Sequence, residues 1–214
     1  MKKLFPILFT LLFMLSCDQG TEKCDGYVDD SCGECSVSLW GKCYDVNETT
    51  GLVLYFNQLT GEIPSSIGNL KNLRYLFLND NQLVGEIPES LGSLKNLTYL
   101  KLSNNNLTGQ IPESLGNLKN LETLHLDNNE LAGKLPLSIG SLKNLTYLKL
   151  SNNNLTGEIP AVIGNLVDLE KLYLTNNQIS GKIPNEIGQL INLEKLRLNK
   201  NNLNGKIPSS IGNL

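Results

Sequence analysis

The stretch Leu97–Asn120, LTYLKLSNNNLTGQIPESLGNLKN, is one clean copy of a pattern that returns every 24 residues along most of the 214-residue chain. Further copies begin at Leu73, Leu121, Leu145, Leu169 and Leu193, and a degenerate copy begins near Thr49. The copy that begins at Leu193 ends at Leu214, two residues short of a full unit. The prolines keep the same period: Pro64, Pro88, Pro112, Pro136, Pro160, Pro184 and Pro208. A fixed period of about 20 to 30 residues predicts a solenoid, in which each unit buries its apolar face against its neighbours.

Each half of the unit predicts its own local structure. Leu100 and Leu102 alternate with polar residues, which is the period of a strand, so stacked units should form a parallel sheet. The Ile-Pro step that follows Gly109 should be extended, because the residue before a proline avoids the helical region. Residues 113–116 should then form one short helical turn before the next unit begins.

The full repeat reads L-x-x-L-x-L-x-x-N-x-L-x-G-x-I-P-x-x-I/L-G-x-L-x-N. It resembles the leucine-rich repeat, and its G-x-I-P half resembles the subclass typical of plant receptor ectodomains. The resemblance implies a leucine-rich-repeat solenoid of the α/β class, a right-handed curved coil with a parallel sheet on its concave face. We therefore expect a signal peptide at 1–16, a cysteine-containing cap and linker at 17–48, and an array of about seven units at 49–214, the last incomplete.

One column of asparagines follows the predicted strands, where the chain must turn inward. A side-chain amide there can satisfy backbone donors and acceptors that the turn leaves buried, so we expect a structural ladder rather than a ligand site. The column consists of Asn57, Asn81, Asn105, Asn129, Asn153, Asn177 and Asn201.

Function must come from positions that the repeat leaves free, chiefly the outward strand positions of the concave face. These positions are rich in aromatic and basic residues although the chain has a net charge of −3, and tyrosine and arginine are enriched at binding hot spots. We therefore predict a face that binds an extracellular protein, peptide or anionic glycan. The candidate binding residues are Tyr75, Phe77, Tyr99, Lys101, His125, Asp127, Tyr147, Lys149, Lys171, Tyr173, Lys195 and Arg197. The bland alternative is that duplicated units inherited good strand-surface residues without any ligand.

The N-terminus has the pattern of an export signal. Lys2 and Lys3 precede a mostly apolar run, Leu4–Leu15, which is too short to span a bilayer. Met14-Leu15-Ser16-Cys17 resembles a bacterial lipobox, although Met14 replaces the usual Leu, and the resemblance implies lipidation of Cys17. The alternative is ordinary cleavage near Ser16. No second apolar run provides a transmembrane anchor.

Four further cysteines, Cys24, Cys32, Cys35 and Cys43, lie just before the array, where the first coil needs a cover. Export favours two disulfides among them, with three possible pairings. The segment 40–43, W-G-K-C, resembles the end of the plant-type N-terminal cap, which makes Trp40 the candidate plug on the exposed core. Two alternatives are a zinc site on the same cysteines, from the C-x-x-C at 32–35, and a calcium loop at residues 25–30.

Catalysis has little support in the sequence. The single histidine, His125, lies two residues before Asp127, and Ser103 or Ser151 could complete a Ser/His/Asp set from a neighbouring strand. No nucleophile elbow accompanies them, and the strict period leaves no room for an active-site loop. We therefore expect no enzyme and no cofactor. We also expect no nucleic-acid partner, because the chain has no basic run.

The preferred interpretation is an exported protein of the bacterial envelope or surface, anchored through Cys17, that binds a ligand outside the cytoplasm. One alternative is a secreted eukaryotic receptor-like or inhibitor-like ectodomain; its sequons at Asn47, Asn96, Asn106, Asn144 and Asn154 could then carry glycans. Another is a structural or adhesive surface protein without a discrete ligand. Because the last unit stops within its consensus, we expect the sequence to be a fragment; the alternative is that another chain covers the exposed apolar end.

Overall fold

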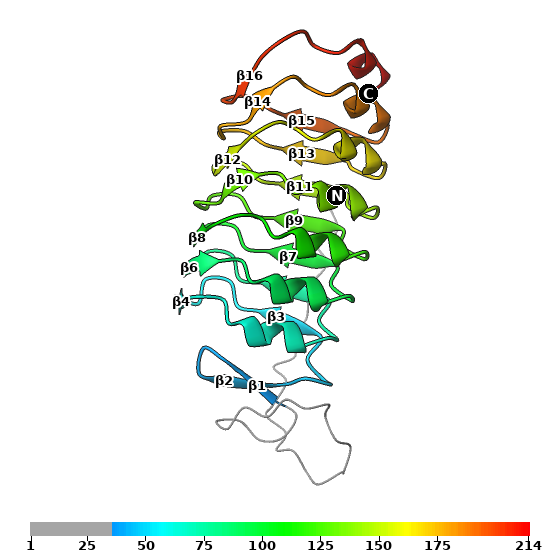
Figure 1. The fold of residues 1–214 in the computed structure, drawn as a ribbon. Coiled ribbons are helices and arrows are strands. Elements are labelled where there is room, and N and C mark those ends of the chain that lie inside the picture. Colours follow the sequence, from blue (N-terminus) through cyan, green and yellow to red (C-terminus); the bar gives the residue numbers. More distant parts are fainter. Residues whose placement is uncertain (1–35) are drawn as a thin grey trace, which may run out of the picture.

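A computed structural model describes residues 36–214 of the chain. The predicted signal peptide, the lipidation site Cys17, the segment suggested for calcium, and the cysteines Cys24, Cys32 and Cys35 lie outside the described residues. The described part is a stack of units that each contain a strand, a turn and a short helix, as Figure 1 shows from blue to red.

The main sheet contains one strand from each unit, all parallel, in the order β15-β13-β11-β9-β7-β5-β3. Its strands are β3 (Gly51–Val53), β5 (Tyr75–Phe77), β7 (Tyr99–Lys101), β9 (Thr123–His125), β11 (Tyr147–Lys149), β13 (Lys171–Tyr173) and β15 (Lys195–Arg197). Neighbouring strands pair in register one repeat apart, so that Leu76 lies opposite Leu100 and Leu100 opposite Leu124. Each repeat position therefore forms a straight column across the sheet.

A row of 3-10 helices lies apart from the sheet (Figure 1). They are η1 (Ser65–Asn69), η2 (Glu89–Ser93), η3 (Glu113–Asn117), η4 (Leu137–Ser141), η5 (Ala161–Asn165), η6 (Asn185–Gln189) and η7 (Ser209–Asn213). Each begins directly after the Ile/Leu-Pro step, and that proline has extended dihedral angles, as at Pro112 (φ −61°, ψ 137°). The predicted helical turn is thus a 3-10 helix of five residues.

Short strands between the main sheet and the helices pair with their counterparts in neighbouring units. They are β4 (Thr60–Gly61), β6 (Gln82–Glu86), β8 (Asn106–Thr108), β10 (Ala132–Lys134), β12 (Asn154–Thr156), β14 (Ser180–Gly181) and β16 (Asn202–Leu203). At the N-terminal end of the stack, β1 (Ser36–Leu39) and β2 (Lys42–Asp45) form an antiparallel hairpin.

The leucine and isoleucine columns form one continuous core that runs the length of the stack. In the unit 97–120, Leu97, Leu100, Leu102, Leu107 and Leu118 are all completely buried. Their contacts come from the units above and below as well as from their own. The array is thus stabilised by nearest-neighbour packing, as the repeat predicts.

Two glycine columns permit this close stacking. Gly85 has φ of 76°, and a Cβ there would lie 2.8 Å from Cγ of Glu62 in the preceding unit. Gly92, in η2, has an ordinary φ, but a Cβ there would lie 2.4 Å from the carbonyl oxygen of Ser114 in η3. The first column needs glycine mainly for its backbone conformation, and the second for the approach of neighbouring helices.

The hairpin β1–β2 covers the first coil of the core. Val37 and Leu39 are buried in the same cluster as the leucines of the array, and Trp40 is only partly buried against it. Trp40 and Gly41 form the two-residue turn with positive φ values of 47° and 75°, the geometry of a type I′ hairpin turn. The apolar cover is thus supplied mainly by β1, with Trp40 at its margin.

Candidate functional site

The concave face is the side of the main sheet that carries the outward strand positions, where the sequence predicts the binding residues. At its N-terminal end, Tyr75 stacks on Tyr99 with ring centroids 5.5 Å apart and planes at 14°. Phe77 packs edge-on against Tyr75, and the Lys101 ammonium lies 4.7 Å from the Phe77 ring centroid. The four predicted residues form one aromatic and cationic cluster because they occupy adjacent columns of β5 and β7.

The ring of Tyr99 is also held in place by a hydrogen bond to the residue that precedes β9. Its hydroxyl donates a hydrogen bond of 2.9 Å to Oε2 of Glu122, and this bond raises the pKa of Tyr99. A ring fixed in this way loses less conformational entropy on binding a ligand than a free one would.

A second cluster lies towards the C-terminal end of the concave face. Tyr147 packs edge-on against both His125 and Tyr173, with ring centroids 4.4 Å and 5.4 Å away. The Lys171 ammonium lies 5.2 Å from the Tyr147 ring centroid, and the Arg197 guanidinium lies 4.8 Å from that of Tyr173. Cations over aromatic faces are held in defined positions while their charge still faces solvent. Lys195 lies beside Lys171 across the β13–β15 pair and is exposed.

Two of the predicted binding residues are buried: Tyr173 is 8 % exposed, and Asp127 is only 1 % exposed. Its carboxylate accepts hydrogen bonds from Ser103 Oγ and from Asn128 Nδ2, and it pairs with Lys149 at 2.9 Å. The structure therefore places Asp127 beneath the surface, where it positions Lys149. Sequence spacing gives its side of the strand but not its depth.

His125 lies between two lysine-bearing strands, opposite Lys101 on one side and Lys149 on the other. Burial, reinforced by Lys101, lowers the pKa of His125 to about 4, so the imidazole is neutral at pH 7. Its Nε2 is buried and has no hydrogen-bond partner among residues 36–214. Ser103 donates to Asp127, so these three side chains do not form the nucleophile-to-base contact of a Ser/His/Asp set.

The asparagines after the strands are hydrogen-bonded across units. Asn105 Nδ2 donates to the carbonyl oxygens of Leu78 (3.0 Å) and Leu102 (3.1 Å), and its Oδ1 accepts from the Leu83 N–H at 3.0 Å. Asn81, Asn129, Asn153, Asn177 and Asn201 repeat these donations. Asn57, in the first unit, is exposed; its Nδ2 donates to the Tyr55 carbonyl oxygen of its own unit, and its backbone N–H donates to Asn81 Oδ1. The amides thus satisfy backbone groups that no neighbouring strand reaches.

Of the candidate disulfide cysteines, Cys43 is within the described residues. It lies in β2 and is disulfide-bonded. Which cysteine pairs with which stays a prediction.

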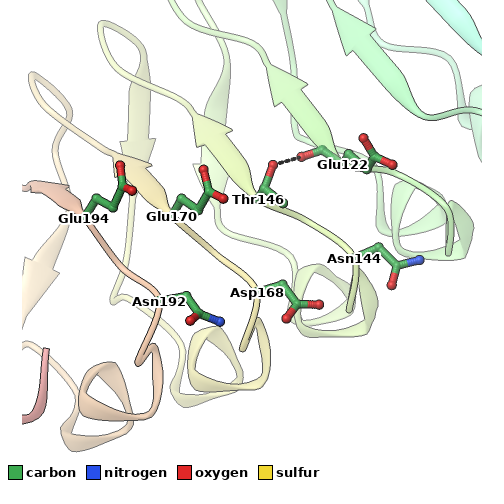
Figure 2. A pocket seen from close by; sticks show the side chains of 7 residues that line it. All are labelled: Glu122, Asn144, Thr146, Asp168, Glu170, Asn192 and Glu194. Atoms are coloured by element: carbon green, nitrogen blue, oxygen red, sulfur yellow. Dashed lines mark hydrogen bonds between the residues drawn. The ribbon is translucent and has the colours of Figure 1, made fainter.

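A groove of about 540 Å³ that the sequence interpretation missed lies where the chain enters the main sheet. Figure 2 shows Glu122, Glu170 and Glu194 along the strand entrances, with Asn144, Asp168 and Asn192 in a second row below them, nearer the helices. The side-chain amides of Asn144 and Asn192 donate to carbonyl oxygens of the preceding unit, those of Lys119 and Val167. The carboxylate of Asp168, at the equivalent position, has no N–H with which to make this bond. The second repeat position, rich in glutamate only after residue 121, carries the sequence signal for this groove.

A second amide ladder also escaped the sequence interpretation. Asn104 donates to Asp80, Asn128 to Asn104, Asn152 to Asn128 and Asn176 to Asn152, over distances of 2.5 to 3.0 Å. These side chains line the edge of the concave face one position after the binding columns. All five residues have φ between 56° and 58°, which explains the preference for Asn and Asp there.

None of the helices formed by residues 36–214 has the length and hydrophobicity that crossing a membrane requires. In the same residues, no three histidine, cysteine, aspartate or glutamate side chains are arranged to hold a metal ion.

Comparison with solved structures finds plant receptors. The chain is 40 % identical to the Arabidopsis receptor kinase HAESA, solved with the peptide hormone IDA and the co-receptor SERK1, over 77 % of this chain and 28 % of that one, with a TM-score of 0.74. It is 39 % identical to the plant peptide hormone receptor RGFR1, solved with RGF2, over 76 % of this chain and 26 % of that one, with a TM-score of 0.73. The chain thus spans about a quarter of these receptor chains.

A structure of different function is also similar. A plant ice-binding protein is 32 % identical over 71 % of this chain and 64 % of that one, with a TM-score of 0.51. The same architecture therefore serves more than one function, and the ligand must be argued from the surface. A search of curated proteins gives no match.

A family model described as leucine-rich repeat region matches residues 52–152 and 89–214, which together cover most of the chain. The match covers the units whose strands, turns and helices form the solenoid. The chain belongs to the leucine-rich repeat family.

Proposed function

We propose that this protein is an extracytoplasmic recognition module that binds an extracellular peptide or protein on its concave face. The observation that carries the proposal is the pair of clusters on that face, in which aromatic rings fix lysine and arginine side chains above a rigid sheet. The similarity to receptors solved with peptide hormones supports the same ligand class.

The geometry indicates how such a ligand would be held. The strands β5 to β13 are each paired on both sides, so a ligand on the concave face meets side chains rather than free backbone groups. Exposed Tyr75 and half-buried Tyr99 and Tyr147 offer apolar contact, while Lys171, Lys195 and Arg197 concentrate positive charge towards the C-terminal end. The partner that fits is therefore elongated, with an anionic part over β13 and β15.

Export and anchoring are part of the proposal. The lipobox-like segment ending at Cys17 supports a lipid-anchored protein of the bacterial cell envelope. Mass spectrometry of the mature N-terminus tests this directly. A diacylated Cys17 is expected, whereas an unmodified N-terminus, or glycans on Asn47 or Asn96, would favour the secreted eukaryotic alternative.

The binding face is tested by replacing its central residues together, as Tyr99→Ser, Lys101→Gln, Tyr147→Ser and Lys149→Gln. Peptides selected from a random displayed library on the unmodified protein should bind this variant at least about tenfold more weakly, since aromatic and cationic residues dominate hot spots. Unchanged affinity would refute the proposed function.

A matched control carries four changes on the short strands that follow the main-sheet strands in each unit: Gln82→Ser, Val84→Ser, Asn106→Ser and Asn154→Ser. All four residues are exposed in β6, β8 and β12. The control should retain the affinity, and circular dichroism should show that both variants are folded.

A further inference from the structure

Phe56 in the first unit and Lys200 in the last fill, with positive φ, a position that the units between them give to Asn or Asp, and Phe56 is the aromatic one. It occupies the position that Asp80, Asn104, Asn128, Asn152 and Asn176 fill in later units, and like them it has a positive φ, here 54°. Asn and Asp tolerate this left-handed conformation, whereas a bulky residue rarely adopts it. Phe56 is also 71 % exposed, so burial does not offset the unfavourable backbone conformation. Conformational strain without a packing reward is a mark of functional positions.

Phe56 belongs to a larger apolar surface along β3. Tyr55 is 44 % exposed and packs edge-on against Phe56, with ring centroids 5.9 Å apart. Beside the first residue of β3, Gly51, lies Tyr75 of β5, which is 43 % exposed. We call the surface formed by Gly51, Val53, Tyr55, Phe56, Tyr75 and Phe77 the β3 aromatic strip.

Gly51 leaves one side of the Tyr75 ring uncovered. Strand order places Tyr99 on one side of Tyr75 and Gly51 on the other, and Tyr99 stacks on the ring. Gly51 does not need glycine for its backbone, since its φ is not positive. A Cβ there would lie 3.7 Å from Tyr75 Cδ2, an ordinary contact, so the missing side chain leaves an open notch beside the ring.

The strip is uncharged, unlike the C-terminal half of the concave face. The nearest charged side chains in its columns are engaged: Lys101 lies over the Phe77 ring, and Asp80 accepts hydrogen bonds from Asn79 and Asn104. From Gly51 to Tyr55 the strip is about 13 Å long at about 3.3 Å per strand residue. That length matches about four residues of an extended peptide.

We propose that the β3 aromatic strip binds an uncharged peptide segment that carries proline or aromatic rings, one of them stacked in the Gly51 notch on Tyr75. The inference rests on the proposed function and adds the chemistry of one end of the ligand. Since a ligand on the sheet face gains no ladder hydrogen bonds, it binds best in the polyproline II conformation, whose backbone groups stay solvated. Aromatic-lined grooves are a recurring surface for such segments.

The test uses the full chain and a phage-displayed library of random dodecapeptides. Selected peptides should be enriched in proline and aromatic residues. Synthetic copies, measured by fluorescence anisotropy, should bind Phe56→Asn and Gly51→Thr at least about tenfold more weakly than the unmodified protein. Asn occupies the Phe56 position in other units, and Thr123 occupies the Gly51 position in β9, so both variants should fold. The melting temperature of Phe56→Asn should not fall.

Val84→Thr provides the matched control, because Val84 is 43 % exposed in β6 and lies outside the strip. This substitution should leave peptide binding unchanged. The inference is overturned if the selected peptides lack ring enrichment, if they bind both strip variants with full affinity, or if no peptide is selected. If the fourfold variant of β7 and β11 weakens binding but the strip variants do not, this inference alone fails. If the fourfold variant binds with unchanged affinity, the proposed function fails, and this inference fails with it.

Discussion

The first unit, from Thr49 to Asn72, and the third unit, Leu97–Asn120, share a consensus but differ in what their side chains do. In the third unit the Asn105 side chain is buried and bonds to backbone groups of two units, whereas the equivalent Asn57 side chain is exposed and donates only within its own unit. The third unit places Asn104 in the left-handed position, and the first places Phe56 there. A residue of the repeat thus acquires its structural role from its neighbours.

The largest difference should appear in the amide ladder. Asn129→Ala removes donations to Leu102 and Leu126 and leaves the Leu107 N–H without its acceptor, all with distances of 3.0 Å. Because these backbone groups are buried, we expect a loss of about 3 kcal/mol in the free energy of unfolding. Asn57→Ala should cost less than about 1 kcal/mol. Urea denaturation followed by circular dichroism measures both, and equal losses would contradict the neighbour dependence.

The next difference concerns glycines of the helices. Gly92→Ala should destabilise the array by about 2 kcal/mol, since the added Cβ would lie 2.4 Å from the Ser114 carbonyl oxygen of the next helix. Gly212, at the same position of the last unit, has nothing within 4 Å of its would-be Cβ, so Gly212→Ala should be close to neutral. Thermal unfolding of the pair shows whether the glycine is needed for the neighbour or for its own backbone.

A smaller effect should follow pH. The folded pKa of His125 is about 4 and the unfolded value is about 6.5, so the unfolded chain binds more protons between these limits. Stability should therefore be complete above pH 6.5 and fall as the pH drops towards 4. With allowance for screening of this partly exposed group, the contribution is about 1 to 2 kcal/mol. The variant His125→Gln should lack this part of the pH dependence in urea titrations at pH 7 and pH 4.5; an unchanged slope would exclude His125 as its source.

The smallest effect should be a gain. Phe56→Asn relieves an unfavourable backbone conformation and should stabilise the protein by up to about 1 kcal/mol. The reciprocal change, Asn104→Phe, should destabilise it by about 1 to 2 kcal/mol, because it adds the strain and breaks the exposed ladder to Asp80 and Asn128. Differential scanning calorimetry of the two variants checks the signs, and destabilisation by Phe56→Asn would mean that the ring has a packing role.

Much of the candidate site followed from the sequence because columns are a consequence of the period. The 24-residue spacing alone brings Tyr75 beside Tyr99, and it places Tyr173 diagonally across from Tyr147, in the neighbouring column of the next strand. Depth did not follow: Asp127 has the spacing of an outward residue but is buried beneath Lys149. The acidic groove was missed because its members come from the end of one unit and the start of the next, which no single column unites.

The sequence by itself determined the solenoid, the register of its strands and the residues that share a column. It could do so because leucine, asparagine, glycine and proline at a constant period leave one way to stack the units. The structure was needed to show which side chains of a column reach solvent, which ones bond to or pack against one another, and where an aromatic ring is left uncovered. Those outcomes depend on the residues of neighbouring units, and they make Phe56 and the Gly51 notch stand out from a chain that otherwise repeats itself.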